Sequence, residues 1–122
     1  MKVIVVSRDL IFASRIAAIA AEAGVPDERV DEPGAVLATS RDVVILEWDD
    51  RGPQWAGALA AWTATPDDPQ AGPRVIAAVS HRDPAGIREA KAAGVRHVVA
   101  RSGLAALLRS FLGVAPHTPA IG

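Results

Sequence analysis

The sequence predicts an α/β protein, a three-layer α/β/α sandwich built around a five-stranded parallel sheet. Its 122 residues are enough for one domain with one sizeable core. Short, mostly apolar runs alternate along the chain with stretches whose apolar residues recur at helical spacing. In the run 43–46 every residue is apolar, which is typical of a strand that is covered on both faces of a parallel sheet.

The first half of the chain is expected to hold three strands and two helices. A β-branched run over residues 2–6 predicts the first strand. Asp9 can cap the helix that follows, over about 10–23, and Gly24 ends it. The remaining elements are expected to be a weak strand near 29–31, a short helix over 33–40 and a strand over 42–47.

The second half continues this alternation and ends in a tail. Asp83 is the predicted N-cap of one helix, with Pro84 at its first position, and Ser102 is the predicted N-cap of the last helix. We expect one domain over residues 1–113 and a flexible tail or linker over 114–122. The expected elements are a helix over 54–63, a strand over 74–79, a helix from Asp83 to Gly94, a strand over 95–100 and a helix over 102–112.

The composition argues against several classes of function. The formal net charge is only −1, from 13 basic and 14 acidic residues, and so weak a field argues against direct nucleic-acid binding or attachment to a membrane surface. Cysteine is absent, which excludes disulfides and thiolate metal sites. The opening apolar run is too short for a signal peptide or a membrane span, so we expect a cytoplasmic protein.

The usual signatures of enzymes are also missing from the sequence. It has no GxSxG elbow, no GxGxxG fingerprint and no phosphate-binding P-loop. The histidines His81, His97 and His117 are too far apart to form a metal-binding motif. We therefore expect a protein that is not an enzyme and holds no cofactor or metal.

Polar residues follow four of the predicted strands, at the points where those strands end. Ligands of open parallel sheets bind outside the carboxyl ends of the strands, so these residues are the candidates for a functional site. They are Ser7, Arg8 and Asp9 after the first strand, Glu47, Asp49 and Asp50 after the third, Ser80 and His81 after the fourth, and Arg101 and Ser102 after the fifth.

Several local patterns, in this order, resemble the receiver domains of two-component response regulators over residues 1–113. Lys-Val-Ile-Val-Val at 2–6 resembles the opening strand of that family, and Asp-Val-Val-Ile-Leu-Glu at 42–47 resembles the strand that leads to its phosphorylated aspartate. Val79-Ser80 matches the end of the fourth strand, and Ala-Lys-Ala-Ala-Gly-Val at 90–95 matches the end of the fourth helix. The resemblance implies a CheY-like, flavodoxin-like fold with strand order 2-1-3-4-5.

The resemblance also implies a phosphorylation site, from which this sequence departs. Receivers use two acids after the first strand to hold Mg²⁺, an aspartate to accept the phosphoryl group and a lysine to pair with it. Ser7 and Arg8 stand at the acid pair, with Asp9 one place late. Glu47 stands at the phosphoacceptor position and Arg101 at the lysine, so that Ser80 alone keeps the expected chemistry.

These departures predict a degenerate receiver, or pseudo-receiver. Arg8 would repel a divalent cation, whereas guanidinium groups pair well with a carboxylate. We hypothesise that Arg8, Glu47 and Arg101 form a permanent ion network in place of the metal and the phosphoaspartate. The domain would then signal by contact with a protein partner or an output domain, without Mg²⁺-dependent phosphorylation. The resemblance also implies a homodimer through the last two helices and the strand between them.

Two other interpretations stay open. The chain would be a phosphorylatable response regulator with shifted acidic ligands if Asp9, Asp49 or Asp50 did the work of the missing acids. We expect instead that Asp9 caps a helix and that Asp49 and Asp50 lie in a solvated loop. The chain would alternatively be a flavodoxin-like protein that binds a small ligand, although Ser7-Arg8-Asp9 is a poor phosphate cradle.

Overall fold

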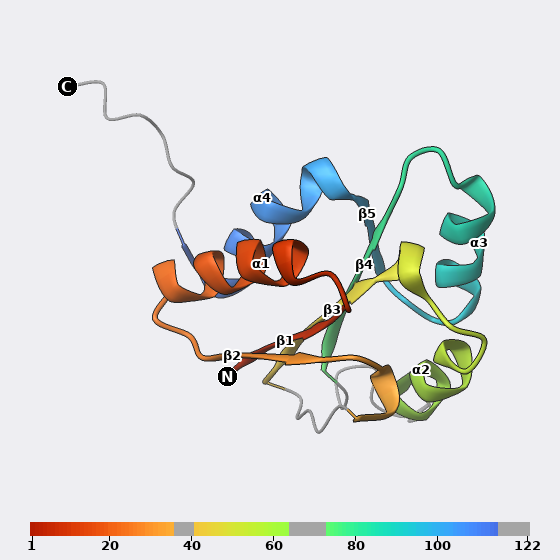
Figure 1. Cartoon of the computed structure of the whole chain (residues 1–122), viewed down its shortest axis with the longest axis horizontal. Helices are drawn as coiled ribbons and strands as arrows, with labels where there is room; N and C mark the ends of the chain where they lie inside the picture. The colour runs from red at the N-terminus through yellow and green to blue at the C-terminus, as the bar shows by residue number, and fades with distance from the viewer. Residues whose placement is uncertain (36–40, 64–72, 115–122) are drawn as a thin grey trace.

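A single sheet with helices on both faces organises the chain (Figure 1). The computed structural model describes residues 1–35, 41–63 and 73–114. The strands are β1 (Val3–Val6), β2 (Asp27–Val30), β3 (Val43–Glu47), β4 (Arg74–Val79) and β5 (His97–Ala100). The helices are α1 (Leu10–Glu22), α2 (Trp55–Thr63), α3 (Pro84–Ala92) and α4 (Arg101–Leu112), with 3₁₀ turns η1 (Pro33–Ala35) and η2 (Trp48–Asp50).

All neighbouring strands are parallel, and their order in the sheet is β2-β1-β3-β4-β5. The predicted α/β/α sandwich with strand order 2-1-3-4-5 is therefore confirmed. Every residue of β1 and β3 is buried, as expected for central strands with helices on both faces. Because the strands are parallel, the segments that follow β1, β3, β4 and β5 meet at one edge of the sheet.

Alternate residues of each strand supply two hydrophobic cores. Val5, Ile45 and Ile76 point to the face covered by α1 and α4, where Leu108 is fully buried. The opposite face, covered by η2, α2 and α3, receives the next residues along the strands, such as Ile4, Val44 and Leu46, together with Trp48, Trp55 and Leu59. Figure 1 shows α1 and α4 side by side on the first of these faces.

Two helices, α1 and α3, begin at the N-cap residues that the sequence predicts. The Asp9 carboxylate accepts hydrogen bonds from the backbone N–H groups of Ile11, at 2.9 Å, and Phe12, at 3.2 Å. The Asp83 carboxylate accepts from the N–H of Gly86 at 2.9 Å, and Pro84 is the first residue of α3. Both predicted caps are confirmed.

The structure departs from the sequence-based prediction in several elements. The strand expected over 95–100 begins later, at His97. The short helix expected over 33–40 is a 3₁₀ turn at Pro33–Ala35, and residues 36–40 lie outside the described part of the chain. The strand expected near 29–31 begins earlier, at Asp27. The predicted Ser102 cap is wrong, because α4 begins at Arg101 after Ala100 and has no side-chain cap.

None of the helices in the described ranges is long and apolar enough to cross a membrane. The tail predicted over 114–122 falls almost wholly outside the described residues, which end at Val114.

Candidate functional site

Five polar residues gather at the carboxyl edge of the sheet, and we call them the strand-end cluster. They come from the ends of four strands that are distant in the chain but adjacent in the sheet. Two of them, Ser7 and Glu47, belong to the few buried polar residues among those described. The cluster consists of Ser7 after β1, Glu47 and Asp49 at and after β3, Ser80 after β4 and Arg101 after β5.

Arg101 is the central cation of the strand-end cluster. Its Nη2 lies 3.3 Å from Glu47 Oε2, and its Nε donates to Asp49 Oδ2 at 3.2 Å. The guanidinium also lies 5.2 Å from the centre of the Phe12 ring, within the range of a cation–π interaction. One arginine thus joins two carboxylates to α1, and the predicted pairing of Arg101 with Glu47 is confirmed.

Glu47 is an acid held in a buried position. Only 5% of its side chain is exposed, and its Oε2 accepts no hydrogen bond even though Arg101 is within ion-pair distance. Burial raises the pKa of Glu47 above its usual value, while the Arg101 guanidinium and the Ser7 hydroxyl oppose this rise. The neighbouring acids Asp9 and Asp50 raise the pKa further. The charge of Glu47 is therefore only partly compensated.

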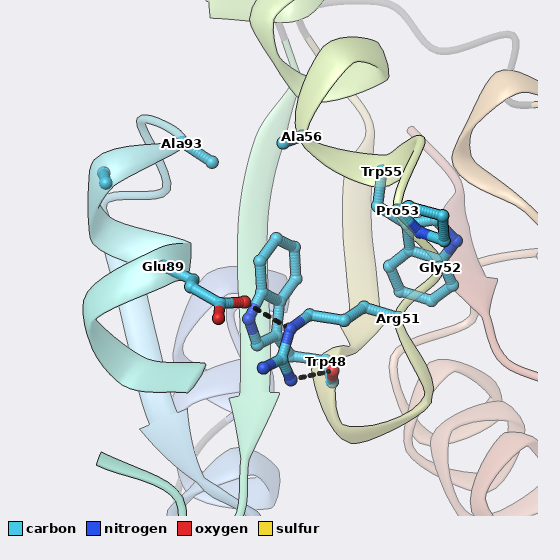
Figure 2. A pocket seen from close by; sticks show the side chains of 9 residues that line it. Trp48, Arg51, Gly52, Pro53, Trp55, Ala56, Glu89 and Ala93 are labelled. Atoms are coloured by element: carbon cyan, nitrogen blue, oxygen red, sulfur yellow. Dashed lines mark hydrogen bonds and ion pairs between the residues drawn. The ribbon is translucent and has the colours of Figure 1, made fainter. Parts of the chain in front are cut away.

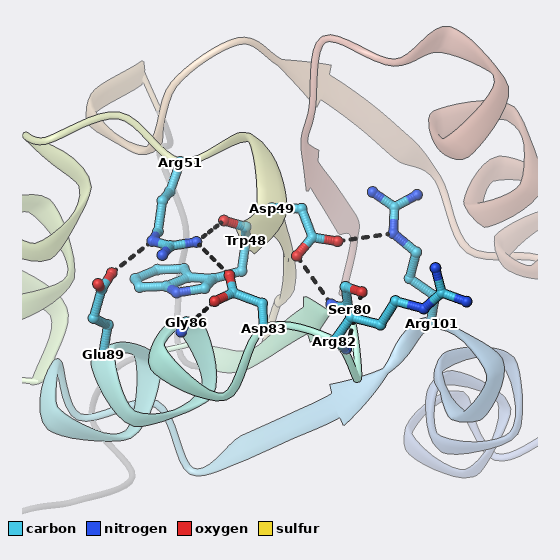
Figure 3. A network of polar contacts seen from close by, with 9 residues as sticks. All are labelled: Trp48, Asp49, Arg51, Ser80, Arg82, Asp83, Gly86, Glu89 and Arg101. Carbon is cyan, nitrogen blue, oxygen red and sulfur yellow. Dashed lines mark hydrogen bonds and ion pairs between the residues drawn. The ribbon is translucent and has the colours of Figure 1, made fainter.

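Asp49, one of the candidates at the end of the third predicted strand, has contacts that the sequence did not predict. We expected a solvated loop acid, but Asp49 Oδ1 accepts from the backbone N–H of Ser80 at 2.9 Å while Oδ2 accepts from Arg101 (Figure 3). Asp49 therefore connects the ends of β3, β4 and β5. Asp49 lies in the 3₁₀ turn η2, which positions its carboxylate between β4 and β5. No local pattern in the sequence predicts such a turn after a strand.

Arg8 does not join the cluster, so its part of the predicted ion network is wrong. Its guanidinium lies 3.5 Å from Glu32, its side chain is 66% exposed, and no ion pair links it to Glu47 in the described structure. The physical reason is position: Arg8 lies two residues after β1, Glu32 lies two residues after β2, and the two strands are neighbours in the sheet. An ion pair between the exposed side chains of Arg8 and Glu32 costs less desolvation than burial of the Arg8 guanidinium beside Glu47.

The remaining predicted site residues have local roles. The Ser80 hydroxyl accepts from the backbone N–H of Arg82 at 3.2 Å, which closes a tight turn after β4. The carboxylate of Asp9 is engaged as the α1 cap. His81 is exposed beside the cluster. Across the described ranges, no three His, Asp or Glu side chains are arranged to hold a metal ion.

A second polar centre, built on Arg51, lies next to the strand-end cluster (Figure 3). Its Nε donates to Glu89 at 2.6 Å, and its Nη1 donates to the Trp48 carbonyl at 3.0 Å and to Asp83 at 3.4 Å. These contacts tie η2 to α3. A Cβ at Gly86 would lie 2.3 Å from Asp83 Oδ2, so glycine is required there for the carboxylate to cap α3 and reach Arg51.

Replacement of Asp49 by alanine should lower the free energy of unfolding by about 1 kcal/mol, because the Ser80 N–H and the Arg101 Nε each lose an acceptor. Asp50→Ala is the matched control, since Asp50 is the exposed next residue, and a change within about 0.5 kcal/mol is expected there. Urea titrations of both variants measure the difference. Equal stabilities would show that the Asp49 contacts contribute nothing.

Comparison with solved structures identifies the same fold in receiver domains. The receiver domain of the Saccharomyces cerevisiae response regulator Ssk1, solved with the histidine phosphotransfer protein Ypd1, is 12% identical, with a TM-score of 0.66 over 91% of this chain and 86% of that chain. The receiver domain of a histidine kinase from Syntrophus aciditrophicus is 14% identical, with a TM-score of 0.64 over 99% and 96% of the two chains.

The sequence itself has no such match. No protein-family model matches the chain, and no curated protein matches it. At these levels of identity, the structural likeness establishes architecture and leaves activity to be argued from the site. The chain therefore has the fold of a response-regulator receiver domain, with a different set of side chains at the carboxyl edge of its sheet.

Proposed function

We propose that this protein is an atypical receiver-like signalling module, a pseudo-receiver that acts by contact with a protein partner or an output domain. It is not an enzyme in this proposal, and it does not undergo Mg²⁺-dependent aspartyl phosphorylation. The observation that carries the proposal is the position of Arg101, which lies within 3.3 Å of both Glu47 and Asp49.

The charge at this edge of the sheet supports the proposal. Mg²⁺ needs several oxygen ligands in near-octahedral geometry, and carboxylates are the usual protein ligands. Here two of the three carboxylates at the β3 end, those of Glu47 and Asp49, are already paired with a permanent cation. A divalent ion would have to displace Arg101 and would be repelled by it, so the site is poorly suited to the ion that phosphoryl transfer requires.

The residue at the phosphoacceptor position also argues against phosphorylation. Glu47 has 5% of its side chain exposed and its pKa is raised, chiefly because it is buried. Transfer of a phosphoryl group needs an accessible, ionised carboxylate in line with the donor. A buried glutamate beside an arginine serves better as a fixed counter-charge.

A phosphorylatable regulator with shifted ligands has less support. Asp9 is engaged as the cap of α1, and Asp49 binds the Ser80 N–H and Arg101. Asp50 is exposed and is the acid that such a mechanism would have to use. A flavodoxin-like phosphate cradle after β1 has little support either, because the Ser7 hydroxyl donates to the Asp9 carbonyl and accepts from the Asp9 N–H there.

The face formed by α3, β5 and α4, which the resemblance to receivers implied as a homodimer interface, offers fewer apolar residues for contact than expected. For a homodimer through α3, β5 and α4, Leu104 and Leu108 are unsuitable because both are buried in the core, 4% and 0% exposed. Arg109 pairs with Glu22 of α1. Arg88 and Lys91 on α3 are exposed, and their positive charges favour contact with an acidic protein surface.

Incubation with acetyl phosphate and Mg²⁺ tests the proposal. We expect no shift on a phosphate-affinity gel and no added mass in the intact protein, under conditions where a receiver with the full acid set is modified. An acid-labile, Mg²⁺-dependent modification would refute the proposal. If Asp50→Asn then abolished that modification, the regulator with shifted ligands would be the correct alternative.

A further inference from the structure

A groove of about 490 Å³ lies between α2 and α3, and we call it the α2–α3 groove (Figure 2). Ala56 of α2 and Ala93 of α3 lie on opposite sides of it, and a hydrogen bond of 2.6 Å joins the side chains of Arg51 and Glu89 between them. None of the residues of the strand-end cluster lines this groove. It is therefore a separate feature of the surface.

The helix on one side of the groove, α2, has no charged face. Its sequence is Trp-Ala-Gly-Ala-Leu-Ala-Ala-Trp-Thr, with no charged residue at any position. A helix that is apolar all round is normally buried, but Ala56 and Gly57 of α2 are exposed. Depletion of charged residues is also typical of the cores of protein interfaces. The outer side of α2 therefore has the composition of a surface that another protein covers.

The polar groups in the groove are already paired, which argues against a small-molecule site. The Arg51 guanidinium pairs with both Asp83 and Glu89. The rings of Trp48 and Trp55 are only 2% and 3% exposed and belong to the core beneath the groove. A small-molecule site normally offers a few free polar groups that orient the ligand. The described residues that line this groove include no polar side chain that is both unpaired and exposed.

The shape and the backbone of the groove favour a helix as its occupant. Both of its sides are helices, whose backbone N–H and C=O groups are bonded internally, so an extended peptide would find few partners for its own backbone. A helix satisfies its own backbone groups. The exposed methyl groups of Ala56 and Ala92 would let such a helix approach closely, with its aliphatic side chains packed between α2 and α3.

The unpaired charges of α3 are positive. Arg88 and Lys91 are exposed, and neither has an ion-pair partner among the described residues. Arg88 lies one helical turn before Ala92 and therefore on the same face of α3. The third charged residue of this helix, Glu89, is compensated by Arg51. A partner whose charges complement this side of the groove is therefore acidic.

We propose that the α2–α3 groove docks an amphipathic helix of a protein partner. The apolar stripe of that helix packs against Ala56 and Ala92, and its acidic residues lie beside Arg88 and Lys91. The inference rests on the proposed function, in which the domain signals by contact with a protein. It adds the place of that contact and the chemistry of the surface that makes it.

Two synthetic helical peptides test the proposal. Each is alanine-rich and about 20 residues long, enough to form a helix in water, with leucines along one face. Glutamates flank the leucines in one peptide and lysines in the other. In fluorescence anisotropy titrations we expect the glutamate peptide to bind saturably, at least about tenfold more tightly than the lysine peptide, with a gap that narrows as salt is added. Equal affinities, or no saturable binding of the glutamate peptide up to about 1 mM, would overturn the proposal.

Four variants, each checked for folding by circular dichroism, locate the binding. Ala56→Gln puts a longer side chain over the groove and should weaken binding of the glutamate peptide at least about tenfold, whereas Ala18→Gln, at an exposed position of α1, should leave it unchanged. Arg88→Glu should reverse the preference between the peptides. Arg15→Glu changes the net charge equally, at an exposed arginine of α1, and should not reverse it. An Ala56→Gln variant that binds normally, or equal effects of the two charge reversals, would overturn the proposal.

Two more results separate this proposal from its alternatives. Light scattering should show a monomer, and a dimer that Ala56→Gln dissociates would assign the groove to a second copy of the chain and overturn the proposal. Phosphorylation by acetyl phosphate together with binding of the glutamate peptide would refute the proposed function and support the docking groove. The absence of both would refute the docking groove alone.

Discussion

Replacement of Trp48 by alanine is expected to lower the free energy of unfolding by about 3–5 kcal/mol. The side chain is 2% exposed and packs in the core between the sheet, α2 and α3, where its neighbours include Trp55 and Leu59. Its removal would leave a large cavity and would also take away the ring beneath Arg51. Urea titration followed by far-UV circular dichroism measures the loss without depending on tryptophan fluorescence.

Two further substitutions test whether the loss of stability in Trp48→Ala comes from the buried ring. Trp48→Phe keeps most of the apolar contact and removes the unpaired indole N–H, so it should cost much less than alanine. Leu10→Ala is a control on an apolar residue that is 66% exposed, and it should change stability by no more than about 0.5 kcal/mol. A loss below about 1 kcal/mol in Trp48→Ala would contradict the buried position of this ring.

Replacement of Arg101 by methionine is expected to cost about 2 kcal/mol at neutral pH. Removing one partner of a buried ion pair typically costs about 3–5 kcal/mol, and the value is discounted here because Arg101 itself is 43% exposed. Methionine keeps the apolar packing on Phe12, so the loss reports chiefly on the charge. Glu47 would remain buried, with the Ser7 hydroxyl but without a cation.

The cost of Arg101→Met should depend on pH in a defined direction. Because the folded-state pKa of Glu47 is raised above 4.5, the folded protein binds more protons than the unfolded chain just above that pH, and stability falls as pH rises through this window. Loss of Arg101, which opposes the rise, would extend the window upward. The deficit should therefore be full at neutral pH and shrink as Glu47 becomes protonated.

A double variant and a matched control make this prediction specific. Glu47→Gln resembles the protonated acid, so the combination with Arg101→Met should recover most of the loss and remove its pH dependence. Arg109→Met, which breaks the more exposed pair with Glu22, should cost less than Arg101→Met and show no such pH profile. A deficit that is the same at every pH and unaffected by Glu47→Gln would rule out the charge explanation.

The parts of the fold that were predictable are those set by local chemistry. The apolar run at β3 and the caps at Asp9 and Asp83 specify their elements through burial, backbone hydrogen bonds and the geometry of proline. The start of α4 was not predictable in this way. Ser102 is a residue type that favours the N-cap, yet α4 begins one residue earlier, at Arg101, and no side chain caps it.

The candidate site was predicted in outline and not in its contacts. Strand order alone brings Glu47, Ser80 and Arg101 to one edge, and the pairing of Glu47 with Arg101 follows from charge. The choice between Glu32 and Glu47 as the partner of Arg8 depends on the relative burial of the two acids, which appears only in three dimensions. The role of Asp49 depends likewise on a 3₁₀ turn that no local motif encodes.

The edge strand β2 has a consequence for solubility. Its sequence, Asp-Glu-Arg-Val, places three charged, exposed residues on a strand whose outer side has no neighbour in the described sheet. An open row of backbone donors and acceptors invites pairing with a strand of another molecule, and charges on the edge oppose that pairing. The charged residues of β2 therefore oppose edge-to-edge aggregation of the folded protein.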